Sequence, residues 1–215
     1  MTRKILYLGL DPLYYQGEGE VVHWPIIEII PRPLSDPALQ ESLLSFDRYS
    51  HVVITSKSTV SILDSYLQLL GFEREHWKEK VILAVGKVTA SHLRDLQIIP
   101  THICQEESAE GMIEVLSHLN LEGAYLFWPH SSKARPLISR FLEEKRVCFS
   151  ECLLYEPRAR EETTPLPDVN SFDEIVFTSP STVEAFLKIF ETFPVGPQLS
   201  PIGPVTAQKL PPLHI

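Results

Sequence analysis

The sequence predicts an α/β protein of two similar lobes, each with a parallel sheet flanked by helices. Three observations carry this prediction. Short apolar runs alternate with amphipathic stretches of helical spacing, which is typical of βαβ units. Two blocks of sequence recur in the second half of the chain. The length of 215 residues is enough for two modest hydrophobic cores of about 100 residues each.

The apolar runs predict five strands, at residues 5–10, 51–55, 81–85, 125–128 and 174–178. Amphipathic stretches between and after these runs predict helices. The residues that recur at helical spacing are Val60, Leu63, Leu67 and Leu70 in one stretch, Met112, Leu116 and Leu119 in another, and Val183, Phe186, Leu187 and Phe190 in a third.

Two pairs of segments match without gaps. VVITSKSTVSIL (52–63) aligns with IVFTSPSTVEAF (175–186), and VILAVGKVTASHL (81–93) aligns with QLSPIGPVTAQKL (198–210). A repeat period this long excludes a solenoid, whose units are much shorter. We therefore expect one duplication and two homologous lobes.

Two further apolar segments end in proline, WPIIEIIPRP (24–33) and ECLLYEPRAR (151–160). Each lies next to an expected lobe boundary, so we expect them to cross between the lobes side by side as a two-stranded β-ladder. Residues 34–150 would then form an inserted lobe. Residues 1–23 and 161–215 together would form a terminal lobe.

The composition excludes several classes of protein. The formal net charge is −9 and the sequence pI is about 5.4, which argues against nucleic-acid binding and against adsorption to anionic membranes. Three cysteines without CxxC spacing suggest neither a disulfide framework nor a zinc site. The N-terminal apolar run is too short for a secretory signal or a membrane span. We expect a reduced, cytoplasmic protein.

Polar residues gather where the expected strands end and helices begin, which is the edge where open α/β sheets bind ligands. Hydroxyl groups of TSKS (55–58) and TSPS (178–181) can cap helices whose free N–H groups attract anions, and Pro180 suits a first helical turn. VGKVTA (85–90) and IGPVTA (202–207) offer a glycine turn and a threonine near a helix start. WPHSSKARP (128–136) follows another strand.

These motifs supply the candidate binding residues Thr55, Ser56, Lys57, Ser58, Gly86, Lys87, Thr89, Ser131, Lys133, Thr178, Ser179, Ser181, Gly203 and Thr206, with Arg135 nearby. Taken singly, such hydroxyls are more often plain helix caps. The duplication favours a site, because both lobes would present the same edge toward a shared cleft.

The sequence shows no motif for a nucleotide site, a metal site or a catalytic triad. It contains no P-loop and no GxGxxG motif, and its eight histidines are scattered without metal-binding spacing. No catalytic triad is apparent. Glu106, Glu107 and Glu110 are expected at a solvated helix start, where the helix dipole favours acidic residues.

Tyr155 is the aromatic residue that stands out, because it lies in LLYEP on a proposed crossing strand. On position alone it is expected to pack between the lobes. If it faces the cleft, its phenol could donate a proton or a hydrogen bond to a leaving group.

The ordered set of motifs over residues 24–210 resembles the uroporphyrinogen-III synthase family. The resemblance implies two α/β lobes joined by a β-ladder, with the active site in the cleft between them. It implies a reaction without cofactor or metal on the linear tetrapyrrole hydroxymethylbilane, in which ring D is inverted through a spiro intermediate. It also implies that Tyr155 assists departure of the hydroxyl, and that the substrate carboxylates meet the helix starts and hydroxyls named above.

The same resemblance implies a monomer that takes its substrate by transient handoff from hydroxymethylbilane synthase. The sequence departs from the family pattern in three places. Asp11 follows the first strand where a basic residue is usual, and residues 11–23 are too short and too rich in glycine for a full helix. The C-terminal LPPLHI also stops where relatives continue into a further helix. A non-catalytic or decayed two-lobed binding protein for a small polycarboxylate anion is therefore the alternative.

Overall fold

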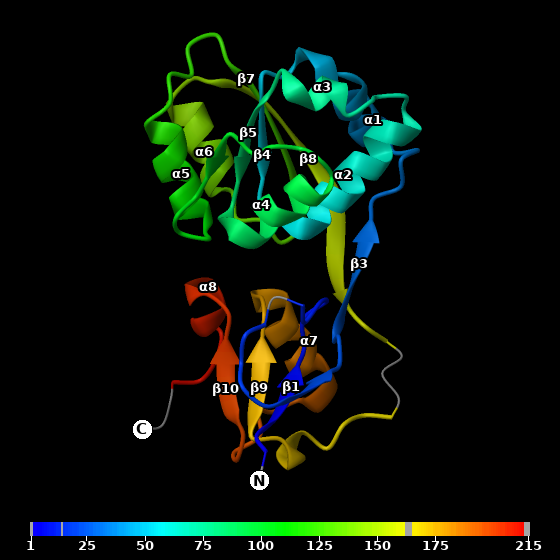
Figure 1. The fold of residues 1–215 in the computed structure, drawn as a ribbon, viewed down its shortest axis with the longest axis vertical. Helices are drawn as coiled ribbons and strands as arrows, with labels where there is room; N and C mark the ends of the chain where they lie inside the picture. Colours follow the sequence, from blue (N-terminus) through cyan, green and yellow to red (C-terminus); the bar gives the residue numbers. More distant parts are fainter. Residues whose placement is uncertain (1, 14, 162–164, 213–215) are drawn as a thin grey trace. The chain divides into compact units, whose positions relative to one another are not determined.

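The computed structural model describes residues 2–13, 15–161 and 165–212. The chain forms two compact units, and each is described here by itself. Unit 1 consists of Met1–Ile30 together with Pro157–Ile215, and unit 2 of Pro31–Glu156. The chain passes from one unit to the other twice, within strands β3 (Ile27–Pro31) and β8 (Cys148–Ala159) (Figure 1).

Unit 2 is built on a six-stranded sheet in the order β3-β8-β7-β4-β5-β6. Its other strands are β4 (His51–Ile54), β5 (Val81–Ala84), β6 (His102–Ile103) and β7 (Tyr125–Ser131). Pairing is parallel from β6 to β8. β3 runs antiparallel to β8, since Arg32 N–H donates to Leu154 O while Arg160 N–H donates to Ile26 O. The expected pairing of the two proline-ended segments is confirmed.

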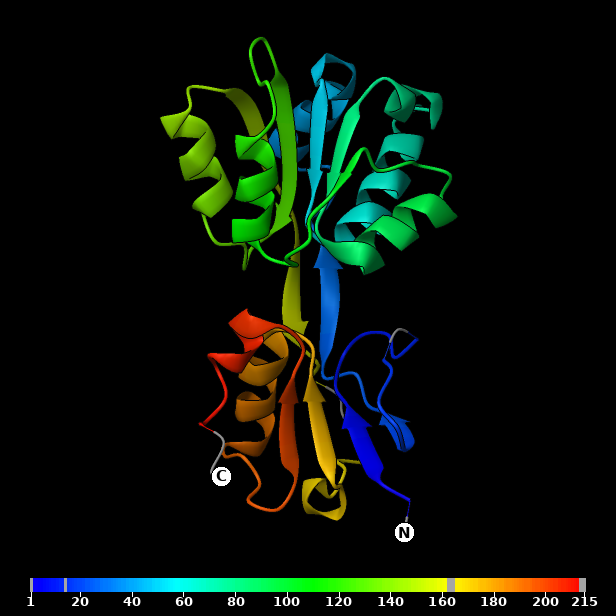
Figure 2. The ribbon, with the colours of Figure 1, turned by 60° about the vertical axis from the view of Figure 1, so that its left-hand side comes forward.

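Helices cover both faces of this sheet, as expected for a parallel sheet whose strands are buried on both sides (Figure 2). α2 (Lys57–Leu69) and α4 (Gly86–Asp95) pack together, and so do α5 (Ala109–Ser117) and α6 (Leu137–Glu144). The remaining helices are α1 (Pro37–Leu44), η1 (Phe46–Arg48) and α3 (Glu75–Lys78).

Alternate residues of β7 divide the core of unit 2 between the two faces. Leu126 and Trp128 pack with Met112 of α5 and Ile138 of α6. Phe127 points the other way and stacks on Tyr49 with ring centroids 4.6 Å apart. The strand therefore reads as a continuous apolar run although each residue faces one side only.

Unit 1 has a four-stranded parallel sheet in the order β10-β9-β1-β2. Its strands are β1 (Lys4–Tyr7), β2 (Glu20–His23), β9 (Glu174–Phe177) and β10 (Gln198–Pro201). Its helical elements are α7 (Pro180–Phe190), the short α8 (Pro204–Ala207) and the 3-10 turn η2 (Val169–Ser171). Phe177, Val183 and Phe186 pack with Leu6 and Leu8 in the core.

Strand β2 was not predicted. All four of its residues are exposed at the edge of the sheet, so no buried apolar run marks it in the sequence. It lies in the segment 11–23 that the sequence shows to be too short for a full helix, and it pairs with β1 instead.

The predicted duplication is visible in the strand registers. His51 lies opposite Val81 in unit 2, and the aligned residues Glu174 and Gln198 lie opposite each other in unit 1. The same correspondence holds along both strand pairs. The sequence alignment and the hydrogen-bonded ladders therefore agree residue for residue.

The five predicted strands are confirmed with small changes at their ends. The strand expected at residues 125–128 continues to Ser131, because its pairing with β8 extends to Tyr155. In the described part of the chain, no helix is both long and apolar enough to cross a membrane.

Candidate functional site

The carboxyl edge of the unit 2 sheet brings together candidate residues that follow or end four strands. Thr55 and Ser56 follow β4, Gly86 follows β5, Ser131 ends β7, and Tyr155 lies on β8. Parallel strands end at a common edge, so segments separated by up to 100 residues or so in the chain supply neighbouring side chains. This edge is the candidate site of unit 2.

Ser56 is the N-cap of α2. Its backbone is extended, with φ −160° and ψ 160°, and its Oγ accepts the Thr59 N–H at 3.1 Å. Thr55 precedes the cap, and Lys57 and Ser58 begin the helix. Ser56 Oγ also lies 2.8 Å from Tyr155 Oη, so the cap side chain contacts the candidate catalytic tyrosine directly.

A β-bulge places the Tyr155 side chain. β7 and β8 pair regularly as far as His130 with Leu153, and the next pair is Ser131 with Tyr155, which leaves Leu154 as the extra residue. A shift of one residue moves a side chain to the other face of a sheet. Tyr155 therefore faces the same side of the sheet as Phe127. On that side it contacts Ser56 at the start of α2.

Tyr155 is 7% exposed, so its ring is packed. Among the described residues, Ser56 supplies the one hydrogen-bond partner of the phenol oxygen. The oxygen has further hydrogen-bonding capacity, because a phenol can both donate and accept. The Tyr155 hydroxyl is therefore held in place and can still form a hydrogen bond with a ligand.

The start of α4 is occupied by a side chain of the protein itself. The Glu107 carboxylate accepts the Lys87 N–H at 3.1 Å, and a Cβ at Gly86 would overlap the Glu107 side chain. Gly86 has φ +76°, a conformation that favours glycine. Thr89 is buried within α4. Glu107, expected in the sequence only as a solvated residue, thus neutralises one of the predicted anion-binding helix starts.

Arg135 is likewise engaged. Its two guanidinium nitrogens donate to the two Glu110 carboxylate oxygens at 2.6 Å each. This pairing lowers the pKa of the Glu110 carboxyl and raises that of Arg135. Beside it, Ser131 Oγ accepts the Lys133 N–H at 3.3 Å and Tyr155 O accepts the Ser132 N–H at 3.0 Å, so this turn is fastened to both β7 and β8.

The carboxyl edge of unit 1 repeats the first motif. Ser179 caps α7 with φ −162° and ψ 162°, and Pro180 is in the first turn as expected. Thr178 ends the strand run, and Ser181 lies in the first turn of α7. Gly203 has φ +86° and caps α8, in which Thr206 is buried.

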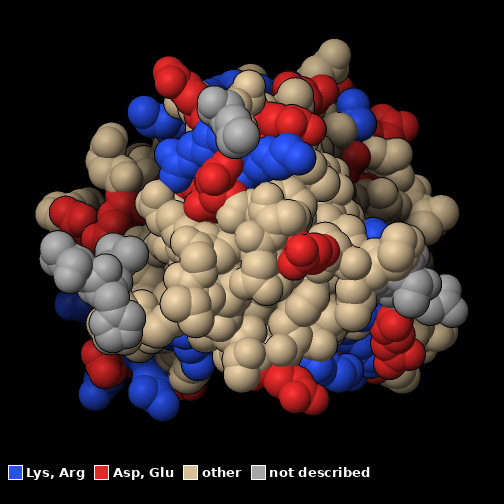
Figure 3. All heavy atoms as spheres, turned by 90° about the horizontal axis from the view of Figure 1, so that it is seen from below, with Lys and Arg blue, Asp and Glu red and all other residues tan. Residues whose placement is uncertain are grey.

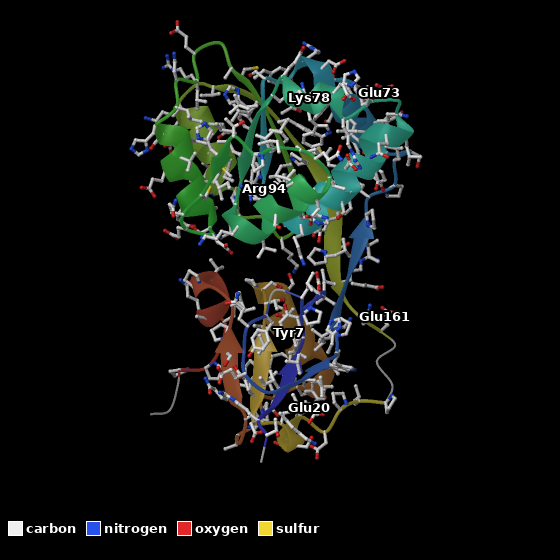
Figure 4. The ribbon with its side chains drawn as sticks, viewed as in Figure 1. Tyr7, Glu20, Glu73, Lys78, Arg94 and Glu161 are labelled. Atoms are coloured by element: carbon white, nitrogen blue, oxygen red, sulfur yellow. The ribbon has the colours of Figure 1, made fainter. Side chains whose placement is uncertain are left out.

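Tyr7 and His23 are polar residues at this edge that the sequence reading did not single out. Tyr7, labelled in Figure 4, donates its hydroxyl proton to Asp11 O at 2.9 Å, and His23 Nε2 lies 2.9 Å from Gly9 O. Burial raises the pKa of the Tyr7 phenol. Both side chains hold the loop after β1 onto the sheet. No signal in the sequence separates Tyr7 from an ordinary core residue or His23 from an ordinary exposed residue.

Thr59 is the other missed residue. It is 0% exposed, and its Oγ1 lies 2.9 Å from Ser56 Oγ. Its place three residues after the cap is the position from which a side chain can return to an N-cap, which was the available signal. No group of three or more potential metal ligands occurs within the described residues.

The family model described as "Uroporphyrinogen-III synthase HemD" matches residues 12–215 of the chain. The chain belongs to the uroporphyrinogen-III synthase family. The predicted family resemblance is thereby confirmed, and so is the α/β fold with two sheets of mainly parallel strands.

Curated relatives extend this result. A Methanothermobacter thermautotrophicus protein, whose name assigns uroporphyrinogen-III synthase provisionally, is 28% identical over 210 residues, covering 89% of this chain and 79% of that protein. The "Porphyrin biosynthesis protein HemD" of Ruminiclostridium josui is 24% identical over 203 residues and covers 91% of this chain. This chain spans 38% of the length of the latter protein.

Solved structures of the family share the fold. A uroporphyrinogen III synthase mutant from Thermus thermophilus aligns with a TM-score of 0.65 and 15% identity, over 97% of this chain and 88% of that one. Uroporphyrinogen-III synthetase from Helicobacter pylori aligns with a TM-score of 0.61 and 20% identity, over 96% and 86%. At these identities the likeness concerns the fold alone.

Proposed function

We propose that this protein is a uroporphyrinogen-III synthase, a hydro-lyase that cyclises hydroxymethylbilane with loss of water and inversion of ring D. The observation that carries the proposal is the Tyr155 hydroxyl, held 2.8 Å from Ser56 Oγ at the carboxyl edge of the unit 2 sheet. Family membership supplies the class of reaction, and this geometry supplies a residue able to begin it.

Tyr155 is proposed to donate its proton to the hydroxyl that leaves ring A, so that water departs and an azafulvenium-like electrophile remains. Ring D attacks through its substituted carbon to give the spiro intermediate. The intermediate fragments, and ring D recloses through its other carbon. The proton lost from ring D in that closure restores the tyrosine, so one molecule of water is lost in total.

The protein must also favour one of the two possible ring closures of a reactive substrate, with or without inversion of ring D. Because the free linear tetrapyrrole closes without inversion, the main task of the protein is to hold the chain in the geometry of the spiro route. No cofactor enters this scheme. We extend the proposal to a monomer that receives its substrate from hydroxymethylbilane synthase.

We propose that substrate carboxylates bind to local hydroxyls and amides. In unit 2 the candidates are Thr55, Lys57, Ser58, Ser131 and Lys133. In unit 1 they are Thr178, Ser179, Ser181, Gly203 and Thr206. Gly86, Lys87 and Thr89 are weaker candidates than the sequence suggests, because Glu107 already occupies the start of α4.

The test is to incubate the protein with freshly prepared hydroxymethylbilane and to resolve the uroporphyrinogen isomers. We expect the inverted type III isomer to predominate. Exclusive formation of the uninverted isomer would contradict the synthase proposal. Tetrapyrrole binding without a change in isomer ratio would instead identify a decayed, binding-only member of the family.

A further inference from the structure

The two units contain the same capping sequence with the same backbone. Ser56 and Thr59 in unit 2 correspond to Ser179 and Thr182 in unit 1. Both serines are N-caps in extended conformation, with φ and ψ equal to within 2°. A difference between their side-chain hydrogen bonds must therefore come from what surrounds them.

Their hydroxyl groups are bonded differently. In unit 1, Ser179 Oγ accepts the Thr182 N–H at 3.3 Å and Thr182 Oγ1 accepts the Ser179 N–H at 3.2 Å, which is a complete capping box. The Thr182 hydroxyl proton is donated to the backbone oxygen of Ser179 at 2.7 Å. In unit 2, Thr59 Oγ1 instead lies 2.9 Å from Ser56 Oγ, which in turn lies 2.8 Å from Tyr155 Oη. The unit 2 copy adjoins the proposed catalytic tyrosine.

The direction of the hydrogen bonds that join Thr59, Ser56 and Tyr155 follows from counting their protons. The Thr59 side chain is fully buried, and its one hydrogen-bond partner within the described residues is Ser56 Oγ. A buried hydroxyl proton without an acceptor is costly, so Thr59 donates to Ser56. Ser56 Oγ also accepts the Thr59 N–H at 3.1 Å, and a serine oxygen has two lone pairs.

With both lone pairs of Ser56 used, its proton is what remains for Tyr155. Tyr155 Oη then accepts from Ser56, and the phenolic proton is directed away from Ser56. The opposite arrangement, in which Tyr155 donates to Ser56, would leave the buried Thr59 proton without an acceptor among the described residues.

We propose that Thr59 is a positioning residue that fixes the direction of the hydroxyl chain, so that Tyr155 presents its proton to a ligand. The use of that proton rests on the function proposed above. Ser56 then acts as a relay of hydrogen-bond direction and serves the tyrosine rather than a substrate carboxylate. Thr59 itself touches no reacting atom.

The kinetic test compares Thr59→Val with Thr182→Val, the same change at the equivalent position of unit 1. Both replace one buried hydroxyl by a methyl group of nearly the same size. We expect Thr59→Val to lower kcat about tenfold, the size of one lost hydrogen bond in the transition state, with KM within about twofold. Thr182→Val should leave kcat within about twofold. Thr59→Ser should retain most activity. Equal kcat values for Thr59→Val and Thr182→Val, or loss of activity in Thr59→Ser, would overturn the proposal.

A second measurement does not depend on turnover. Neutron diffraction from a deuterated crystal of the whole chain should place the deuteron between these oxygens on Ser56 Oγ, with the Tyr155 deuteron pointing elsewhere. A deuteron on Tyr155 pointing to Ser56 would overturn the proposal even in an active enzyme. If the wild-type chain gives only the uninverted isomer, the proposed function is wrong, and the neutron map still decides the direction of the chain.

Discussion

Tyr155 is the residue on which the proposed reaction depends most. Changing it to Phe keeps the ring in place and removes the proton donor, so we expect turnover to fall by about one to three orders of magnitude. The measurement is the rate of type III isomer formation. Tyr66→Phe is the matched control. Tyr66 lies in α2, and the change also removes one hydrogen bond of a phenol, the one donated to Arg32 O at 2.7 Å. Turnover of Tyr155→Phe equal to that of the control would remove Tyr155 from the mechanism.

The three cysteines are expected to differ in reactivity. Burial raises the pKa of the Cys104 thiol to about 11 and that of Cys152 to about 12, whereas Cys148 is exposed. The thiolate is the reactive form, so at pH 8 one thiol per folded chain should react quickly with iodoacetamide. Mass spectrometry of digested protein should locate the label on Cys148. Rapid labelling of Cys104 or Cys152 would contradict their burial.

The same buried groups give a pH dependence of stability. Burial also raises the pKa of the Tyr49 phenol to about 12. Groups with a raised pKa in the folded state stabilise it fully below their unfolded pKa, and the stabilisation is lost as pH rises toward the folded value. Because unfolded thiols ionise near pH 8.5, we expect the free energy of unfolding to fall from about pH 9 upward. Urea titrations at pH 8 and pH 10 measure this, and equal midpoints would contradict it.

At the scale of elements, the start of α4 illustrates a close fit between two loops. Gly86→Ala should destabilise the protein by more than the about 1–2 kcal/mol expected for a left-handed backbone, because the new Cβ overlaps Glu107. Gly123→Ala is the control, since Gly123 has φ +71° and open space around it. Adding Glu107→Ala to Gly86→Ala should recover the excess, as measured by chemical denaturation. An additive double mutant would show that the two residues do not interact.

The sequence predicts elements that carry a local pattern. The five predicted strands, the cap at Ser56 and the cap at Ser179 follow from apolar runs and hydroxyl positions, and the structure confirms them. β2 was missed because an exposed edge strand has no apolar alternation. The bulge at Leu154 was also out of reach, since it depends on how β7 and β8 pair and not on the residues of either strand alone.

Side-chain partnerships across long separations in the chain could not be predicted either. The Tyr155 position was found by its motif, yet its contact with Ser56 depends on the bulge and on the sheet order. Glu107 and Glu110 read as solvated acids in the sequence. In the fold they face Lys87 N and Arg135, which changes the set of groups left for an anionic ligand.

The net charge of −9 must be reconciled with the proposed substrate, which carries eight carboxylates. On the face drawn in Figure 3, Lys and Arg are interspersed with Asp and Glu around a largely uncharged centre, so this face presents no broad basic surface. Recognition through amides, hydroxyls and a few lysines would be local. Long-range attraction is therefore not expected to drive association.

Local recognition of this kind predicts how salt affects the proposed activity. Screening shortens the range of charge interactions to about 8 Å at physiological salt, which weakens the overall repulsion between two acidic partners. We expect kcat/KM for hydroxymethylbilane to stay level or rise as sodium chloride increases. A steep fall with salt would instead indicate steering by a basic surface.

The two units share a strand order that the chain builds in a different sequence. In unit 2 the chain forms β4 and β5 before β7 and β8, whereas in unit 1 their counterparts β9 and β10 come after β1 and β2, with the same neighbours in the sheet. Unit 1 is therefore a circular permutation of the unit 2 arrangement. The same strand order therefore forms whichever strand comes first in the chain. In unit 2 both connections to the rest of the chain leave through one hydrogen-bonded strand pair, β3 and β8. A break in the polypeptide elsewhere, for instance in the exposed turn around Gly123, would therefore leave the pairing of the strands unchanged.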